Sequence, residues 1–336
     1  MLHFFENILQ HKSISVVGLA KNAGKTECLN YILKELKNFS ETVAITSIGI
    51  DGESYDSVSN LPKPEITIYE GMIFITSETH YRQKKFVSEI LDISNIQTSL
   101  GRLIIAKALT QGKIILSGPA DTASLKLLIN SMLNYGANTT IVDGALSRLS
   151  PASPAVSEAM ILSTGAAVSK NFDKLVRHTK YVYDLINLNL TDDFLRNKLF
   201  SIENGIWAVS ADNQIYDLQI PSSFMLEKNE ENIFRFGKTF FVSGAVSDGL
   251  LRFFKSQKHV NEIKIIIRDF TKIFVSEDNF YTFIKKGGKI EVLDKSKLLA
   301  VSINPTSPDG YHLNGDKLIG ELQKIIVVPV FDVRKL

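Results

Sequence analysis

Residues 14–36 read ISVVGLAKNAGKTECLNYILKEL, and they predict a strand, a glycine-containing loop and a helix in direct succession. The apolar run at 14–17 is typical of a buried strand. The dipeptide Lys25-Thr26 stands where the helix would begin. Beyond it, apolar side chains recur at the i, i+3, i+4 and i+7 positions that share one helix face; they are Leu29, Ile32, Leu33 and Leu36.

A strand, a glycine loop, Gly-Lys-Thr and a helix together form the arrangement of a phosphate-binding P-loop. Backbone N–H groups of such a loop and the open helix N-terminus make a concave site for an anion. Lys25 would then contact the terminal phosphates, and the Thr26 hydroxyl would ligate Mg²⁺. We therefore expect a nucleotide to bind at Gly18, Lys21, Asn22, Ala23, Gly24, Lys25, Thr26 and Glu27.

The loop is one residue longer than the usual P-loop, because five residues separate Gly18 from Gly24 where the common pattern has four. Lys21 lies four residues before Lys25, and the signature lysine of the partitioning-ATPase group stands one residue further away. The alternative interpretation is a strand–helix turn in which Gly-Lys-Thr occurs by chance. The predicted strand before the loop and the predicted helix after it favour phosphate binding.

Two acidic residues follow apolar strands further along the chain. Residues 42–50 predict a buried strand that Asp51 follows, and residues 139–142 predict another that ends at Asp143. Because ligands of open α/β sheets bind at the carboxyl ends of the strands, we expect Thr26, Asp51 and Asp143 to hold Mg²⁺. Lys25 and Asp51 are the expected catalytic residues. The alternatives are that Asp51 forms a turn with the glycine after it, and that an apolar strand ends in aspartate by chance.

Charge and composition exclude several classes of protein. Lys and Arg number 38 and Asp and Glu 36, so a formal net charge of +2 gives no reason to expect nucleic acid or an anionic membrane as a partner. No apolar run reaches the roughly 20 residues of a transmembrane helix, and no signal peptide is recognisable. Cys28 is the single cysteine, which fits a cytoplasmic protein. A helix N-terminus could lower its thiol pKa, or Cys28 could be a small packed residue.

Strands and helices alternate along the chain, which predicts an α/β protein whose parallel sheet is covered on both faces. The length of 336 residues suggests a P-loop nucleotide-binding domain over 1–200 and a smaller α/β accessory or docking domain over 201–336. Helices are expected at 83–92 and 121–134 in the first domain. In the second, strands are expected at 206–210, 239–243, 263–267, 289–293, 298–303 and 325–329, and helices at 245–256, 277–285 and 315–323.

The loop GLAKNAGKT, the Asp51-Gly52-Glu53 turn and the motif IVDGA at 141–145 together resemble the dethiobiotin synthetase branch of P-loop proteins. The resemblance implies that Lys25 contacts phosphates and that Thr26, Asp51 and Asp143 hold Mg²⁺. The substrate-side residues of that family have no counterpart here. An ATP-dependent small-molecule kinase or ligase of this type is the alternative function, and a non-catalytic nucleotide-sensing module is a third. The absence of an Asn-Lys-x-Asp guanine-reading motif favours ATP over GTP.

A second resemblance extends along most of the chain. Its motifs are GLAKNAGKT, IGIDGESYD, SLGRLIIAKAL, LSGPADT, IVDGALSRLSPASP, ILSTGAAVS, IIIRDFTKIF and SINPTSPDGY. With these motifs the chain is similar to the KamB-type subunit of the lysine 5,6-aminomutase reactivase. The resemblance implies a small ATP- and Mg²⁺-binding partner of a larger MutS-like ATPase subunit. Together they would restore an adenosylcobalamin- and pyridoxal-phosphate-dependent aminomutase whose cobalamin has been inactivated.

Overall fold

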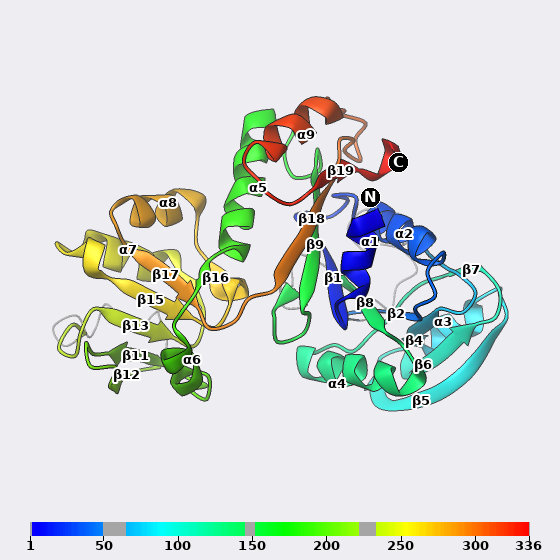
Figure 1. Ribbon diagram of the computed structural model, residues 1–336, viewed down its shortest axis with the longest axis horizontal. Coiled ribbons are helices and arrows are strands. Elements are labelled where there is room, and N and C mark those ends of the chain that lie inside the picture. Colours follow the sequence, from blue (N-terminus) through cyan, green and yellow to red (C-terminus); the bar gives the residue numbers. More distant parts are fainter. Residues whose placement is uncertain (1, 50–64, 145–151, 222–232, 336) are drawn as a thin grey trace. The chain divides into compact units, whose positions relative to one another are not determined.

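The structure, a computed structural model, describes residues 2–49, 65–144, 152–221 and 233–335 (Figure 1). Internal contacts divide the chain into two compact units. Unit 1 comprises Met1–Lys180 and Ser296–Leu336, and unit 2 comprises Tyr181–Lys295. The second unit is therefore inserted in the sequence of the first.

Unit 1 is built on a sheet of nine described strands in the order β19-β18-β9-β1-β8-β2-β4-β6-β5. The strands from β19 to β4 run parallel, and β6 and β5 are antiparallel to their neighbours. Short strands β3 (Ile66–Ile68) and β7 (Gly112–Ile114) form a separate pair. The strand bounds are β1 Ser13–Gly18, β2 Val43–Ser47, β4 Ile73–Ser77, β5 Ser88–Thr98, β6 Gly101–Ala108, β8 Thr139–Gly144, β9 Ala159–Gly165, β18 Lys297–Asn304 and β19 Val330–Asp332.

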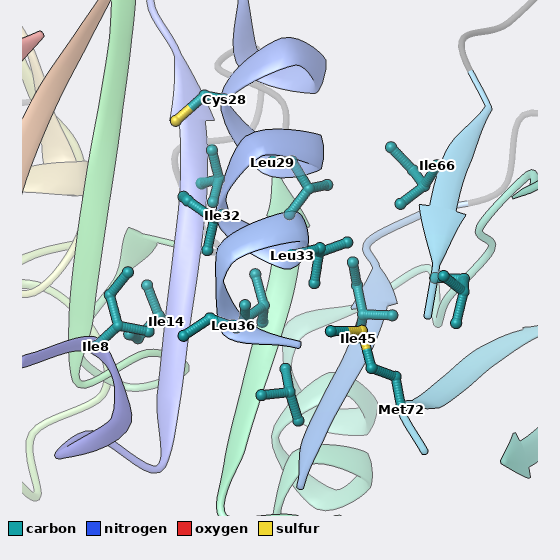
Figure 2. Packing of buried hydrophobic residues seen from close by; sticks show 14 of the residues in the cluster. Ile8, Ile14, Cys28, Leu29, Ile32, Leu33, Leu36, Ile45, Ile66 and Met72 are labelled. Carbon is teal, nitrogen blue, oxygen red and sulfur yellow. The ribbon is translucent and has the colours of Figure 1, made fainter. Parts of the chain in front are cut away.

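Helices cover both faces of this sheet. On one face, α2 (Lys25–Leu36) buries the apolar stripe that the sequence predicts, and Leu29, Ile32 and Leu33 are fully excluded from solvent (Figure 2). On the other face, α4 (Thr122–Met132) packs Leu128 against strand residues of β4 and β6. Burial of one such side chain contributes about 1.5–3 kcal/mol. The other helices of unit 1 are α1 Leu2–Leu9, α3 Glu78–Gln83, α9 Gly315–Gln323, and the 3₁₀ turns η1 Leu133–Tyr135 and η7 Val333–Lys335.

Unit 2 contains a mixed sheet of six described strands in the order β10-β17-β15-β13-β11-β12. Strands β10, β17, β15 and β13 run parallel, and β11 is antiparallel to both of its neighbours. Helix α6 packs on one face through Leu195 and Leu199. On the other face, the ring of Phe254 from α7 lies 4.8 Å from that of Phe240 on β13.

The elements of unit 2 are short. The four strands and two helices that the sequence predicts between residues 206 and 293 are all present, whereas β10, β12, β14, β16 and α6 are not predicted. The strands are β10 Asn189–Leu190, β11 Ile206–Val209, β12 Ile215–Ile220, β13 Thr239–Val242, β14 Val246–Ser247, β15 Lys264–Ile267, β16 Ile273–Phe274 and β17 Lys289–Val292. The helices are α6 Asp193–Leu199, α7 Asp248–Ser256 and α8 Glu277–Lys285, with 3₁₀ turns η5 Val260–Glu262 and η6 Phe270–Lys272. Helix α5 (Phe172–Ile186) contains the boundary between the units.

The α/β class and the large parallel-rich sheet are confirmed, but the division of the chain differs from the predicted boundary at residue 200. Strand β18 pairs in parallel with β9, with Val301 opposite Leu162, and β19 pairs with β18. Residues 296–336 therefore belong to unit 1. The hydrophobic pattern of a strand shows that it is buried, but not which sheet it joins.

The helix predicted at 83–92 is wrong, because residues 88–98 form β5, an edge strand paired with β6. The strand predicted at 325–329 is also wrong, because those residues form a turn and β19 begins at Val330. In the described part of the chain, no helix combines the length and the apolar character needed to cross a membrane.

Candidate functional site

The loop between β1 and α2 is held by its glycines and by β9. Strand β1 is buried along its whole length and ends at Gly18. The next residue, Leu19, donates its N–H to the Ser163 carbonyl at 2.8 Å. Gly24 occupies the N-cap of α2 in the left-handed conformation, with φ +93° and no side-chain cap. A glycine cap brings no side-chain acceptor, so the first-turn N–H groups of α2 stay available to an anion.

Lys25 and Asp143 meet at the carboxyl end of the sheet. Strand β8 lies beside β1, with Asp143 opposite Val16 in the register. The Lys25 ammonium nitrogen Nζ lies 2.6 Å from Oδ1 of Asp143, and the two side chains are 23% and 18% exposed. The two residues that the sequence assigned to phosphate and to metal are thus brought together by neighbouring strands.

The Asp143 carboxylate is placed to attract a cation. Its Oδ1 is buried and accepts no hydrogen bond of ordinary geometry, although the Lys25 ammonium is at ion-pair distance. The two observations agree because ionic attraction has no angular requirement, whereas a hydrogen bond has. A buried carboxylate oxygen that accepts no hydrogen bond can form an ion pair with a lysine ammonium or coordinate a hard metal ion.

Thr26 and Asp143 alone supply too few oxygen ligands for Mg²⁺, so a magnesium ion would bind here only together with a nucleotide. Thr26, on the first turn of α2, is half-buried and would add a hydroxyl to the Asp143 carboxylate. Among the residues that the structure describes, no group of three or more His, Cys, Asp or Glu side chains could hold a metal. A magnesium ion here would therefore take further ligands from phosphate oxygens and water, which is its usual arrangement in nucleotide sites.

Asp51, the third predicted ligand and second predicted catalytic residue, lies outside the described residues. Its strand β2 is the neighbour of β8 on the side away from β1, with Ser47 opposite Asp143. The strands before the two aspartates are therefore adjacent.

The other predicted loop residues differ in exposure. Lys21 and Asn22 are exposed at the loop, and Glu27 is exposed on the first turn of α2. Ala23 is buried, and its N–H donates to the Ala20 carbonyl at 3.3 Å. In this conformation the Ala23 N–H is therefore used within the loop.

Asn304, which the sequence analysis did not select, lies against this loop. Its side-chain Nδ2 donates to the carbonyl of Asn22 at 3.4 Å, and a Cβ added to Gly24 would lie 2.7 Å from the Asn304 Cβ. Asn304 ends β18, two strands away from β1. Its signal in the sequence is a polar residue at the carboxyl end of an apolar strand, the same signal that identified Asp143.

The side chain of Cys28, in the helix that follows the loop, is packed in the core. It is fully buried, and burial raises its pKa to about 11, against the smaller lowering effect of hydrogen bonds with Ser302 and Ser163. Of the two interpretations that the sequence allowed, the structure supports the small packed residue and contradicts a lowered thiol pKa.

No family model, no curated protein and no solved structure matches the chain.

Proposed function

We propose that the loop from Gly18 to Thr26 is a P-loop and that unit 1 binds ATP together with Mg²⁺. The observation that carries the proposal is the ion pair between Lys25 and Asp143, beside the glycine-capped start of α2. Lys25, the open N–H groups of α2 and a carboxylate at the next strand end are the groups that a triphosphate needs. Gly18, Lys21, Asn22 and Ala23 complete the proposed loop, and Glu27 follows it.

In the proposed site, side chains of this chain place charged and polar groups around the phosphates of the nucleotide. Lys25 places a cation on the terminal phosphates, where negative charge accumulates during phosphoryl transfer. The Thr26 hydroxyl and the Asp143 carboxylate would hold Mg²⁺, and Asp51 is proposed as a further ligand that could also orient a water. Bound Mg²⁺ supplies charge neutralisation at the phosphate oxygens. Asn304 would keep the loop in its binding conformation through its contacts with Asn22 and Gly24.

We further propose, from the resemblance to the KamB-type subunit, that the chain serves in a reactivating factor for lysine 5,6-aminomutase. It would act as an ATPase with the MutS-like large subunit on the adenosylcobalamin-dependent enzyme. In unit 2, Phe194 and Phe200 of the α6 region each expose 53% of their surface. Exposed aromatic side chains are typical anchors of protein–protein contacts, which supports a docking role for this unit.

The nucleotide proposal is tested by titrating the chain with a fluorescent ATP analogue in the presence of Mg²⁺. Lys25→Ala removes the phosphate-binding ammonium and is expected to abolish binding while the melting temperature stays within a few degrees. Lys34→Ala is the matched control, because Lys34 is exposed on the same helix and the charge change is the same. Unchanged affinity in Lys25→Ala would contradict the P-loop assignment.

The reactivase proposal is tested by the recovery of a cobalamin-inactivated aminomutase with ATP, adenosylcobalamin and both reactivase subunits. Recovery is expected only when this chain is present, and Lys25→Ala is expected to bind the partner but not to restore activity. Equal recovery without this chain would defeat the proposal. Rapid ATP-dependent conversion of a small amine or acid by the isolated chain would instead favour the kinase or ligase alternative.

A further inference from the structure

Lysines gather where two neighbouring helices of unit 2 end. Helices α7 and α8 each carry a lysine in the last turn, and further lysines follow in the turn after each helix. The two turns lie against each other, because the Lys286 ammonium donates to the Lys255 carbonyl at 3.2 Å. A Cβ added to Gly287 would also lie 2.8 Å from the Cβ of Asn261. We refer to this group as the lysine patch, and its members are Lys255, Lys258, Lys285, Lys286 and Lys289.

The carboxylates near the lysine patch are already paired with other cations. Glu262 lies 2.7 Å from the Lys238 ammonium, and Glu291 lies 3.1 Å from that of Lys264. Within the described residues, no carboxylate forms an ion pair with a lysine of the patch. The patch therefore has excess positive charge, although the formal net charge of the whole chain is only +2.

The helix ends explain only part of this accumulation of lysines. A helix C-terminus carries about half a negative charge and attracts cations in its last turn, so the two helices offset about one of the positive charges. That attraction accounts for Lys255 and Lys285. Lys258 and Lys289 lie beyond the helices and are exposed to solvent. The remaining like charges repel one another, and an anionic partner that covers them would relieve this repulsion.

The chemistry of the two turns favours carboxylates over nucleic acid. Residues 255–263 and 284–289 contain no Arg, Phe, Tyr or Trp, the side chains that bind phosphate in a fork or stack on bases. The N–H groups of Gly287 and Gly288 donate to carbonyls of α8, so they are not open to phosphate oxygens. Ile284 is 38% exposed beside the lysines, and a protein surface could cover this apolar side chain.

We propose that the lysine patch docks an acidic segment of a partner protein, whose carboxylates meet the lysine ammonium groups. The patch is separate in sequence from the loop at Gly18–Thr26, and the proposal does not depend on nucleotide binding. It goes beyond the docking role argued from the exposed aromatic side chains, because it defines the charge of the partner. Attraction of this kind accelerates the encounter of the two proteins and weakens as salt is added.

The test measures the fluorescence anisotropy of a fluorescein-labelled oligoglutamate peptide while the full chain is added at low ionic strength. The wild-type chain is expected to bind the peptide. The triple variant Lys258→Gln, Lys285→Gln and Lys289→Gln is expected to bind it about tenfold more weakly, because three exposed charge interactions are lost. The side chains of these three lysines make no hydrogen bond or ion pair within the part of the chain that the structure describes, so the melting temperature should not change.

The matched control is the triple variant Lys34→Gln, Lys113→Gln and Lys126→Gln, which removes the same charge from exposed positions of unit 1. Its affinity for the peptide is expected to equal that of the wild-type chain. Equal weakening in the two variants would overturn the proposal, since overall charge would then explain binding, and so would the absence of binding by the wild-type chain. Duplex DNA of matched charge is titrated in parallel. Tighter binding of this DNA that only the patch variant loses would overturn the proposal in favour of phosphate recognition.

Discussion

At the scale of single residues, Gly24 combines two requirements that a larger side chain cannot meet. Its φ of +93° lies in the left-handed region, and a Cβ at this position would lie 2.7 Å from the Cβ of Asn304. The first requirement alone costs a non-glycine residue about 1 kcal/mol. The second adds a steric contact with β18 that cannot be relieved by a side-chain rotation.

We predict that Gly24→Ala lowers the free energy of unfolding by about 2–3 kcal/mol, because the strain of the left-handed backbone and the contact with Asn304 add. Gly71→Ala is the control, since Gly71 has φ +84° but open space around its missing Cβ, and it should lose only about 1 kcal/mol. Urea denaturation measures both. Equal losses in the two variants would show that Asn304 does not press on the loop.

Cys28 gives a prediction for alkaline pH. Burial raises its pKa to about 11 from the 9.0 expected of a free thiol, so the unfolded chain loses this proton before the folded chain does. The contribution of the protonated thiol to the free energy of unfolding is fully present below pH 9. It is lost as the pH rises toward 11, which lowers the free energy of unfolding by about 2–3 kcal/mol in total.

The expected result is that Cys28→Ala, measured by urea denaturation at pH 8 and pH 10.5, loses less stability between these values than the wild-type chain does. Both chains contain the same tyrosines, so the difference between them isolates the thiol. In the native wild-type chain at pH 8, iodoacetamide should leave Cys28 unmodified. Rapid modification under native conditions would contradict a buried thiol with a raised pKa.

At the scale of elements, local periodicity predicted the parts that carry the proposed site. Strand β1 and helix α2 lie within a residue or two of their predicted bounds, since alternation of apolar and polar residues is a local property. The helix predicted at 83–92 is wrong for a related reason. Val87, Ile90 and Leu91 have helical spacing, but the segment pairs as the edge strand β5 with irregular register. Tertiary pairing outweighed the local pattern there.

The buried stripe of α2 predicts a contrast between two leucines on helices. Leu33 is fully buried against the sheet, and Leu127 of α4 is 69% exposed. Leu33→Ala should lower the free energy of unfolding by about 2–5 kcal/mol, because a cavity remains in the core. Leu127→Ala should change it by about 0.5 kcal/mol or less. Urea denaturation of both variants checks this, and similar losses would mean that α2 does not pack as described.

The residues of the candidate site also fall into those that the sequence could predict and those that it could not. Lys25 could be predicted because it opens the helix after a recognisable strand and glycine loop, and Asp143 because it ends a run of strand-forming residues; the pairing of β1 with β8 brings them to 2.6 Å. Asn304 carries the same local signal, a polar residue after the strand predicted at 298–303, but its contact with the loop could not be predicted. Its importance depends on the pairing of β18 with β9, a contact between segments more than a hundred residues apart that no local pattern encodes.

At the scale of the whole molecule, the first sheet is assembled from both ends of the chain. We predict that the fragment 1–200, which the sequence suggested as a domain, does not fold cooperatively. It lacks β18 and β19, so the ladder edge of β9 and its apolar neighbours would be exposed. Circular dichroism during urea titration should show a broad transition for the fragment and a sharp one for the full chain. A sharp transition in the fragment would show that β18 is dispensable.

The inserted position of unit 2 also has a consequence for synthesis on the ribosome. Residues 181–295 are contiguous, so this unit can fold as soon as it has left the exit tunnel. The loop at Gly18–Thr26 is translated before unit 2, yet its contact with Asn304 must wait until unit 2 and the strand that follows it have been translated. The loop is thus completed only after the whole of unit 2 has been synthesised, and during that interval the edge of β9 that later pairs with β18 stays exposed to molecular chaperones.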